Sequence, residues 1–174
     1  MKRPDDSGVT LVELVLATAI TGLLGAVIAA AFFVGVKTTD TANTRIATSR
    51  GAQFAAAIFP GDVQSAMTIT TSGTPCSGAS PNVAQLQWQE LNDAGTLPMT
   101  TKVAEWTCRT TGGVTELIRR LTVGGIIQSE IVIARDVSTA AVSCDPGCAT
   151  PTSATMTATA GDLTFVVVGQ RRSQ

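Results

Sequence analysis

The chain has 174 residues and a formal net charge of −1, a balance that gives no indication of a nucleic-acid partner. It contains no histidine, which excludes the Ser/His/Asp and Cys/His arrangements of nucleophilic catalysis. Tyrosine is absent and aromatic residues make up 4% of the chain, so we expect no stacking platform for single-stranded nucleic acid.

Other catalytic patterns are also missing from the sequence, which contains neither a P-loop nor a GxGxxG motif. The carboxylates of the second half are scattered along predicted strands and turns, where we expect solvated surface positions. They include Glu90, Asp93, Glu105, Glu116 and Glu130. We therefore expect no catalytic residue, no cofactor and no enzymatic activity.

An apolar run occupies residues 7–36 and contains a single carboxylate, Glu13. From Leu14 to Val36 about 23 residues carry no charge, and as a helix they measure roughly 34 Å, enough to cross a bilayer. Lys2 and Arg3 precede the run, so the positive-inside preference places the N-terminus in the cytoplasm. We expect a single-pass protein of the cytoplasmic (inner) membrane with an extracytoplasmic head.

Glu13 needs an explanation, because a charge near the bilayer centre costs at least about 2.5–3.5 kcal/mol. The helix offers this acid no partner of its own at a suitable spacing. Either Glu13 meets a cation from elsewhere, or it lies solvated at headgroup depth without a function. A secretory signal cleaved after the run, at Ala29–Ala31, is an alternative. The switch from polar to apolar sequence at Gly8 favours cleavage before the run, which would leave the helix in the mature protein.

Residues 8–13, GVTLVE, resemble the type IV prepilin processing site: glycine, a hydrophobic residue, threonine, leucine, any residue, then glutamate. Val9 departs from the phenylalanine or methionine that is commoner at its position. The resemblance implies cleavage between Gly8 and Val9 by a prepilin peptidase, which also methylates the new N-terminus at Val9. It further implies that Glu13 pairs with an N-terminal amine, its own or a neighbour's, since opposite charges attract strongly in a low dielectric.

From Thr38 to about Thr68 the pattern becomes that of an amphipathic helix. Its apolar residues recur at spacings near three to five: Ile46, Phe54, Ile58 and Val63. We expect the last three to lie in the core of a globular head. Pro60–Gly61 predicts a kink or a break, and Asp62 is placed to cap a short following turn.

Alternating apolar and polar residues predict strands in the rest of the chain. The predicted strands are Val83–Trp88, Lys102–Cys108, Val114–Leu121, Ile126–Ala134, Ala140–Ser143 and Leu163–Val168. Gly112–Gly113 and Gly124–Gly125 predict tight hairpins, hence consecutive antiparallel strands. Residues 69–82 and 145–162 are rich in Thr, Ser, Gly and Pro and are predicted surface loops. We therefore expect an α+β fold, and the prepilin resemblance implies a pilin-like one: a long N-terminal helix, its first half transmembrane, packed on a small antiparallel sheet.

The order of these pieces is similar to that of J-type minor pseudopilins of type II secretion systems and their relatives. Residues 55–66 (AAAIFPGDVQSA) and 164–173 (TFVVVGQRRS) carry this resemblance. Four parts are expected: a leader peptide, a transmembrane or filament-core helix, its amphipathic continuation and an extracytoplasmic β-rich head. Their bounds are 1–8, 9–36, 37–68 and 69–174.

Four cysteines lie in the predicted external part: Cys76, Cys108, Cys144 and Cys148. An even number outside the cytoplasm favours two disulfides, for which three pairings exist. We predict Cys144 with Cys148, closing the loop around residues 145–147, and Cys76 with Cys108. Zinc is the alternative, but the chain has no CxxC pair, and we expect no metal.

Two classes of function remain. The first is a minor pilin or pseudopilin, assembled through its N-terminal helix in a type IV pilus, type II secretion or competence-type filament. Its partners would be prepilin peptidase/methyltransferase, other pilins or pseudopilins, a membrane platform protein and membrane lipid. The second is a membrane-tethered adhesive or DNA-binding protein that uses the pilin route for export. DNA binding would need the basic pairs Arg119–Arg120 and Arg171–Arg172 to come together, and nucleic acid is not an expected partner.

Overall fold

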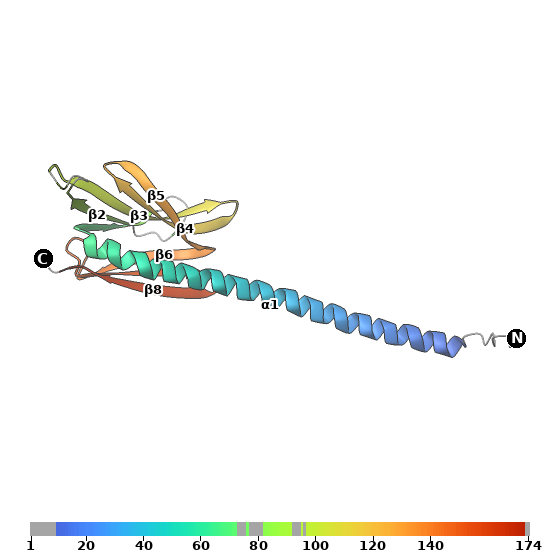
Figure 1. Ribbon diagram of the computed structural model, residues 1–174. Coiled ribbons are helices and arrows are strands. Elements are labelled where there is room, and N and C mark those ends of the chain that lie inside the picture. The colour runs from blue at the N-terminus through green and yellow to red at the C-terminus, as the bar shows by residue number, and fades with distance from the viewer. Residues whose placement is uncertain (1–9, 73–75, 77–81, 92–94, 96, 173–174) are drawn as a thin grey trace. The chain divides into compact units, whose positions relative to one another are not determined.

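The structure, a computed structural model, describes residues 10–72, 76, 82–91, 95 and 97–172. The chain forms two compact units, Met1–Asn43 and Thr44–Gln174. Helix α1 runs from Leu11 to Ser65 and contributes to both units. Among the described residues, eight strands follow it in two antiparallel sheets, all within the second unit (Figure 1). The predicted α+β class is confirmed.

Within each sheet, strands that follow one another along the chain pair antiparallel, and the hairpins predicted at Gly112–Gly113 and Gly124–Gly125 are both present. The larger sheet has the order β1-β2-β3-β4-β5 and the smaller sheet the order β6-β7-β8. The strands are β1 (Thr68–Thr71), β2 (Asn82–Glu90), β3 (Thr100–Thr111), β4 (Val114–Val123), β5 (Ile126–Arg135), β6 (Val137–Asp145), β7 (Ser153–Ala160) and β8 (Leu163–Gln170).

Two strands lie in segments predicted to be loops, so those predictions were wrong there. β1 falls within residues 69–82 apart from its first residue, and β7 falls within residues 145–162. β7 is the central strand of the smaller sheet, and its even-numbered residues from Ala154 to Ala160 are buried. Alanine and threonine carry a weak hydrophobic signal, but small alternating side chains fit a closely packed sheet face.

Helix α1 continues through Pro60 to Ser65, so the predicted break is absent. Proline costs an interior helix position about 3 kcal/mol through the missing N–H and a steric clash. Phe59 and Val63, on either side of Pro60, are fully buried, and their packing holds this turn in place. Asp62 is not a cap but a buried residue within the helix.

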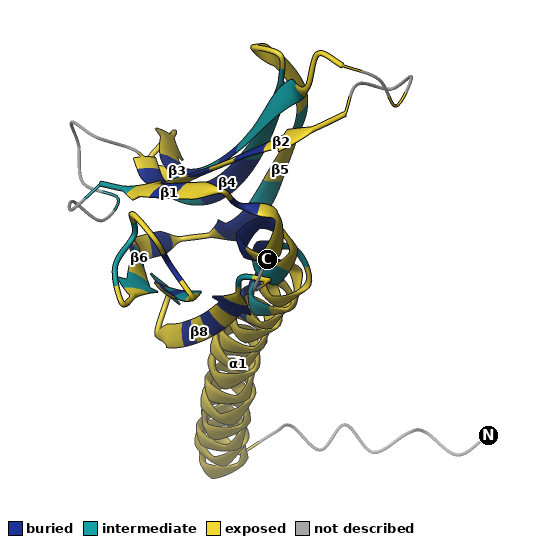
Figure 2. Ribbon diagram, turned by 90° about the vertical axis from the view of Figure 1, so that its left-hand side faces the viewer, coloured by how far each residue is buried: buried dark blue, intermediate teal, exposed yellow. Residues whose placement is uncertain are grey.

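The buried side of α1 has a spacing of four residues: Gly51, Ala55, Phe59 and Val63 are all buried. Figure 2 shows the long N-terminal part of the helix as exposed, in yellow. Phe59 meets the ring of Trp106 edge to face, with centroids 5.5 Å apart. The core prediction is confirmed for Val63 and wrong for Phe54, whose exposure is 53%.

Two glycines allow α1 to approach both sheets closely. A Cβ atom on Gly51 would lie 2.9 Å from the carbonyl oxygen of Ile133 in β5. A Cβ atom on Gly169 in β8 would lie 2.6 Å from Cβ of Val63. The part of the helix within the second unit is therefore packed against β5 on one side and β8 on another.

Candidate functional site

The start of helix α1 is built as a capping box from Thr10 and Glu13. The Thr10 backbone N–H and hydroxyl donate to Glu13 Oε2, at 3.0 and 2.9 Å. In return, the Glu13 backbone N–H donates to Thr10 Oγ1 at 3.3 Å. This is the reciprocal arrangement of an N-cap threonine with a glutamate three residues later, which satisfies two N–H groups that the helix leaves unpaired. Glu13 is therefore held at a defined place in the first turn.

The expectation that α1 offers Glu13 no partner was wrong, because Thr10 supplies two donors. The signal was present in the sequence as the T-x-x-E spacing of a capping box. An acid in the first turn is also favoured by the helix dipole. Thr10 brings hydrogen bonds but no positive charge, so a carboxylate in lipid still requires a cation.

The predicted cleavage site, Gly8–Val9, and the predicted methylation at Val9 lie outside the described residues. The described helix begins two residues after Val9, at Leu11. Both assignments therefore stay predictions.

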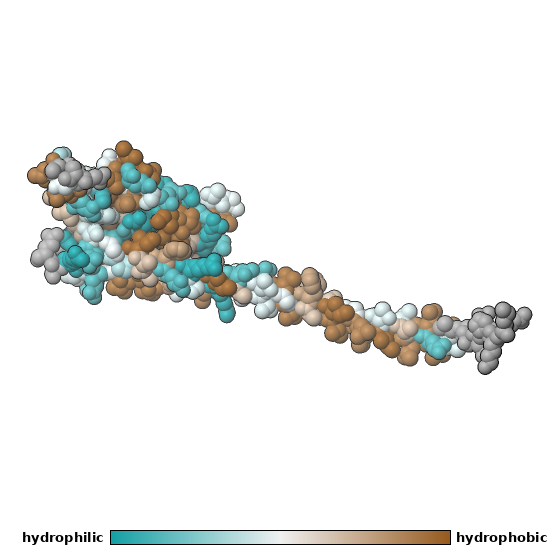
Figure 3. Space-filling model, viewed as in Figure 1, coloured by the Kyte–Doolittle hydropathy of each residue, from teal (hydrophilic) through white to brown (hydrophobic). Residues whose placement is uncertain are grey.

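The helix beyond Glu13 presents apolar side chains all round. From Leu11 to Val36 every residue is exposed, including Leu23 at 68%, Phe32 at 70% and Phe33 at 76%. Figure 3 shows mainly hydrophobic residues, in brown, on the face of this stretch that is in view. Within the described part of the chain, α1 is the one helix long and apolar enough to cross a membrane. An apolar surface of this extent indicates burial in lipid or against other helices.

Threonine hydroxyls within the apolar stretch form hydrogen bonds to backbone carbonyls of the same helix. The hydroxyls of Thr18 and Thr21 donate to the carbonyls of Val15 and Ala17, at 2.9 and 2.8 Å. Such bonds to the preceding turn hide hydroxyl groups that lipid cannot hydrate.

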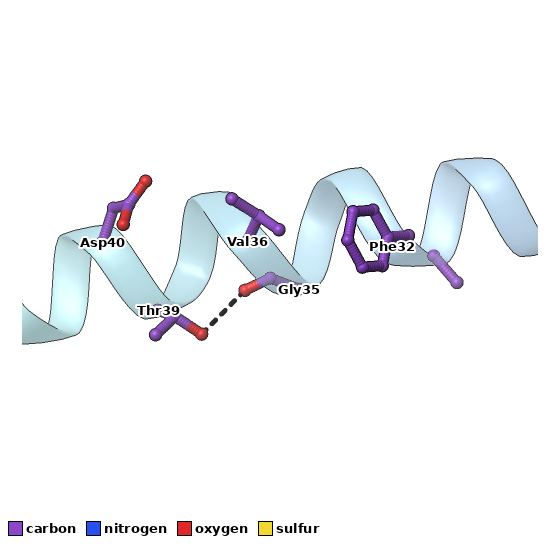
Figure 4. Close-up of a pocket in the computed structure, with 6 residues that line it drawn as sticks. Phe32, Gly35, Val36, Thr39 and Asp40 are labelled. Carbon is purple, nitrogen blue, oxygen red and sulfur yellow. Dashed lines mark hydrogen bonds between the residues drawn. The ribbon is translucent and has the colours of Figure 1, made fainter.

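A shallow hollow follows near the end of the first unit, where Gly35 lacks a side chain. Phe32, Val36, Thr39 and Asp40 line it, and the Thr39 hydroxyl donates to the Gly35 carbonyl at 2.9 Å (Figure 4). This hollow has room for a side chain of a neighbouring helix, as small residues commonly provide in membranes.

Both predicted disulfides are present in the second unit. Cys76–Cys108 joins the segment after β1 to β3, and Cys144–Cys148 closes the loop after β6. No cysteine remains free. The structure thus favours the disulfide interpretation over zinc.

The structure separates the two arginines of the pair Arg119–Arg120. Adjacent residues of a strand point to opposite faces, so Arg119 points inward from β4 and Arg120 outward. Arg119 is buried and bonded to Asp62, whereas Arg120 pairs with Glu130 at 2.9 Å. Arg119 is therefore not part of an exposed basic patch, and the charge of Arg120 is balanced by Glu130.

The carboxylates on the outer face of β3, β4 and β5 form an ion-pair network rather than standing alone in solvent. Glu130 accepts hydrogen bonds from Arg120 and from Arg109, and these lower the pKa of Glu130. The same contact with Glu130, together with Glu116, raises the pKa of Arg109. Elsewhere in the larger sheet, Lys102 lowers the pKa of Glu90. These charges neutralise one another and indicate a stabilising role.

In the described ranges, no group of three or more Cys, Asp or Glu side chains is arranged to hold a metal ion. No protein-family model, curated protein or solved structure matches the chain. The features of the chain that bear on its function are therefore the start of the helix, the apolar surface behind it and the disulfide-bonded head.

Proposed function

We propose that this protein is a minor pilin or pseudopilin: a non-enzymatic structural subunit that a filament takes up through its N-terminal helix. The observation that carries the proposal is the Thr10–Glu13 capping box at the head of an apolar helical stretch that carries no other charge as far as Val36. Thr10 and Glu13, together with Gly8, occupy three positions of the GVTLVE pattern at residues 8–13. The α+β head with one long N-terminal helix is compatible with this role.

In the proposed cycle, prepilin peptidase cuts after Gly8 and methylates the amine of Val9, which keeps its positive charge. Before assembly, Thr10 holds the Glu13 carboxylate at the first turn. During assembly, helices of other pilins or pseudopilins replace lipid around α1. A free amine then neutralises Glu13, since an unpaired charge in a dry environment is costly and a paired one is tolerated.

The proposal includes a location and a direction. α1 anchors the chain in the cytoplasmic membrane, and a platform protein of the assembly machine extracts it into a periplasmic or surface filament. The head lies outside the cytoplasm. Lys2 and Arg3 support this direction through the positive-inside preference, and so do the two disulfides, which persist in oxidising compartments.

Two measurements test the proposal in cells that possess a prepilin peptidase. Mass spectrometry of the mature N-terminus should find methylated Val9 as the first residue. Glu13→Gln should leave this cleavage intact but lower incorporation into filaments at least tenfold, because the charge is lost while the side chain keeps its size. Thr18→Val is the matched control, since it also changes one polar side chain of the apolar helix.

Residues 1–8 still attached to protein from such cells would refute the processing step. Normal incorporation of Glu13→Gln would refute the role of the charge.

The alternative is a membrane-tethered adhesive or DNA-binding protein. The specific observation in its favour is that neither Arg171 nor Arg172 has an ion pair within the described part of the chain. On this alternative, changing both arginines to alanine abolishes DNA binding or adhesion while filaments persist.

A further inference from the structure

We draw no further inference here: the strongest candidate, the exposed apolar surface that Leu91, Leu97, Met99, Ile126 and Ile127 form at one end of the larger sheet, carries none because nothing in the structure shows what covers it.

Discussion

Arg119 and Asp62 form a buried, two-pronged ion pair that joins strand β4 to helix α1. Arg119 Nε donates to Oδ2 of Asp62 at 2.9 Å, and Nη2 donates to Oδ1 at 2.6 Å. The indole N–H of Trp106 adds a third bond to Oδ2 at 3.0 Å. Charge-assisted bonds with this fork geometry are specific in orientation. The pair therefore fixes which turn of α1 faces the larger sheet.

Asp62→Ala should destabilise the protein by about 3–5 kcal/mol, because it leaves Arg119 buried without a counter-charge. Urea unfolding in detergent, followed by tryptophan fluorescence, measures the change, since Trp106 lies beside the pair. Lys102→Ala is the control: it breaks the exposed pair with Glu90 and should cost at most about 1 kcal/mol. Equal losses in the two variants would contradict a structural role for the buried pair.

Gly51→Ala and Gly61→Ala should have opposite effects, although both glycines lie in α1. Alanine is favoured over glycine in a helix by about 1 kcal/mol, and Gly61 has open space around it, so Gly61→Ala should stabilise by up to that amount. At Gly51 a methyl group would meet β5, and the overpacking should cost about 1–3 kcal/mol. Thermal unfolding of both variants and of the unsubstituted protein tests whether each change raises or lowers the melting temperature as expected.

Local patterns in the sequence were enough for the fold class, the six stronger strands and the disulfides. They failed where local and long-range forces compete. Pro60 destabilises its own turn of the helix, but the packing of the buried residues Phe59 and Val63 offsets this. Their contacts are with residues distant in the sequence, so a short stretch of sequence does not reveal them. The partner of Asp62 is 57 residues away on another element, so its ion pair could not be predicted from spacing.

At the candidate site, the sequence identified Glu13 from the cost of a charge in lipid and from the prepilin resemblance. The hydrogen bonds from Thr10 to Glu13 were not predicted, because the cost of a charge in lipid points only to a cation as the partner. The capping-box spacing would have predicted them. In β7 the alternation was present but was carried by alanine and threonine, whose contrast in hydrophobicity is small.

Thr10→Val should weaken assembly less than Glu13→Gln does. The valine removes one donor to the carboxylate and the acceptor for the Glu13 N–H, but leaves the backbone N–H of residue 10 and the charge in place. Loss of an N-cap costs a helix about 0.5–2 kcal/mol. Thr10→Ser keeps all three bonds and should assemble normally. Filament incorporation in cells measures the series, and a Thr10→Ser defect as large as that of Thr10→Val would contradict this account.

The stability of the head should fall in acid as its ion-pair network is protonated. Hydrogen bonds from Arg120 and Arg109 hold the pKa of Glu130 below its usual 4.5. A lowered folded pKa means that the stabilisation is fully present above about pH 4.5 and is lost as the pH falls through the lowered value. Glu130→Gln should therefore show a shallower loss of stability below pH 4.5, measured by urea midpoints at several pH values. Parallel curves for both proteins would contradict the prediction.

Removing the two disulfides should cost unequal amounts. Cys76 and Cys108 are separated by 32 positions in the chain, and Cys144 and Cys148 by 4. The chain-entropy estimate gives about 4 kcal/mol for the longer loop and about 2 kcal/mol for the shorter one, because a long loop restricts the unfolded chain more. Replacing each pair by alanine and comparing urea unfolding tests this order. A larger loss from the Cys144–Cys148 pair would mean that this bridge acts mainly on the folded loop after β6.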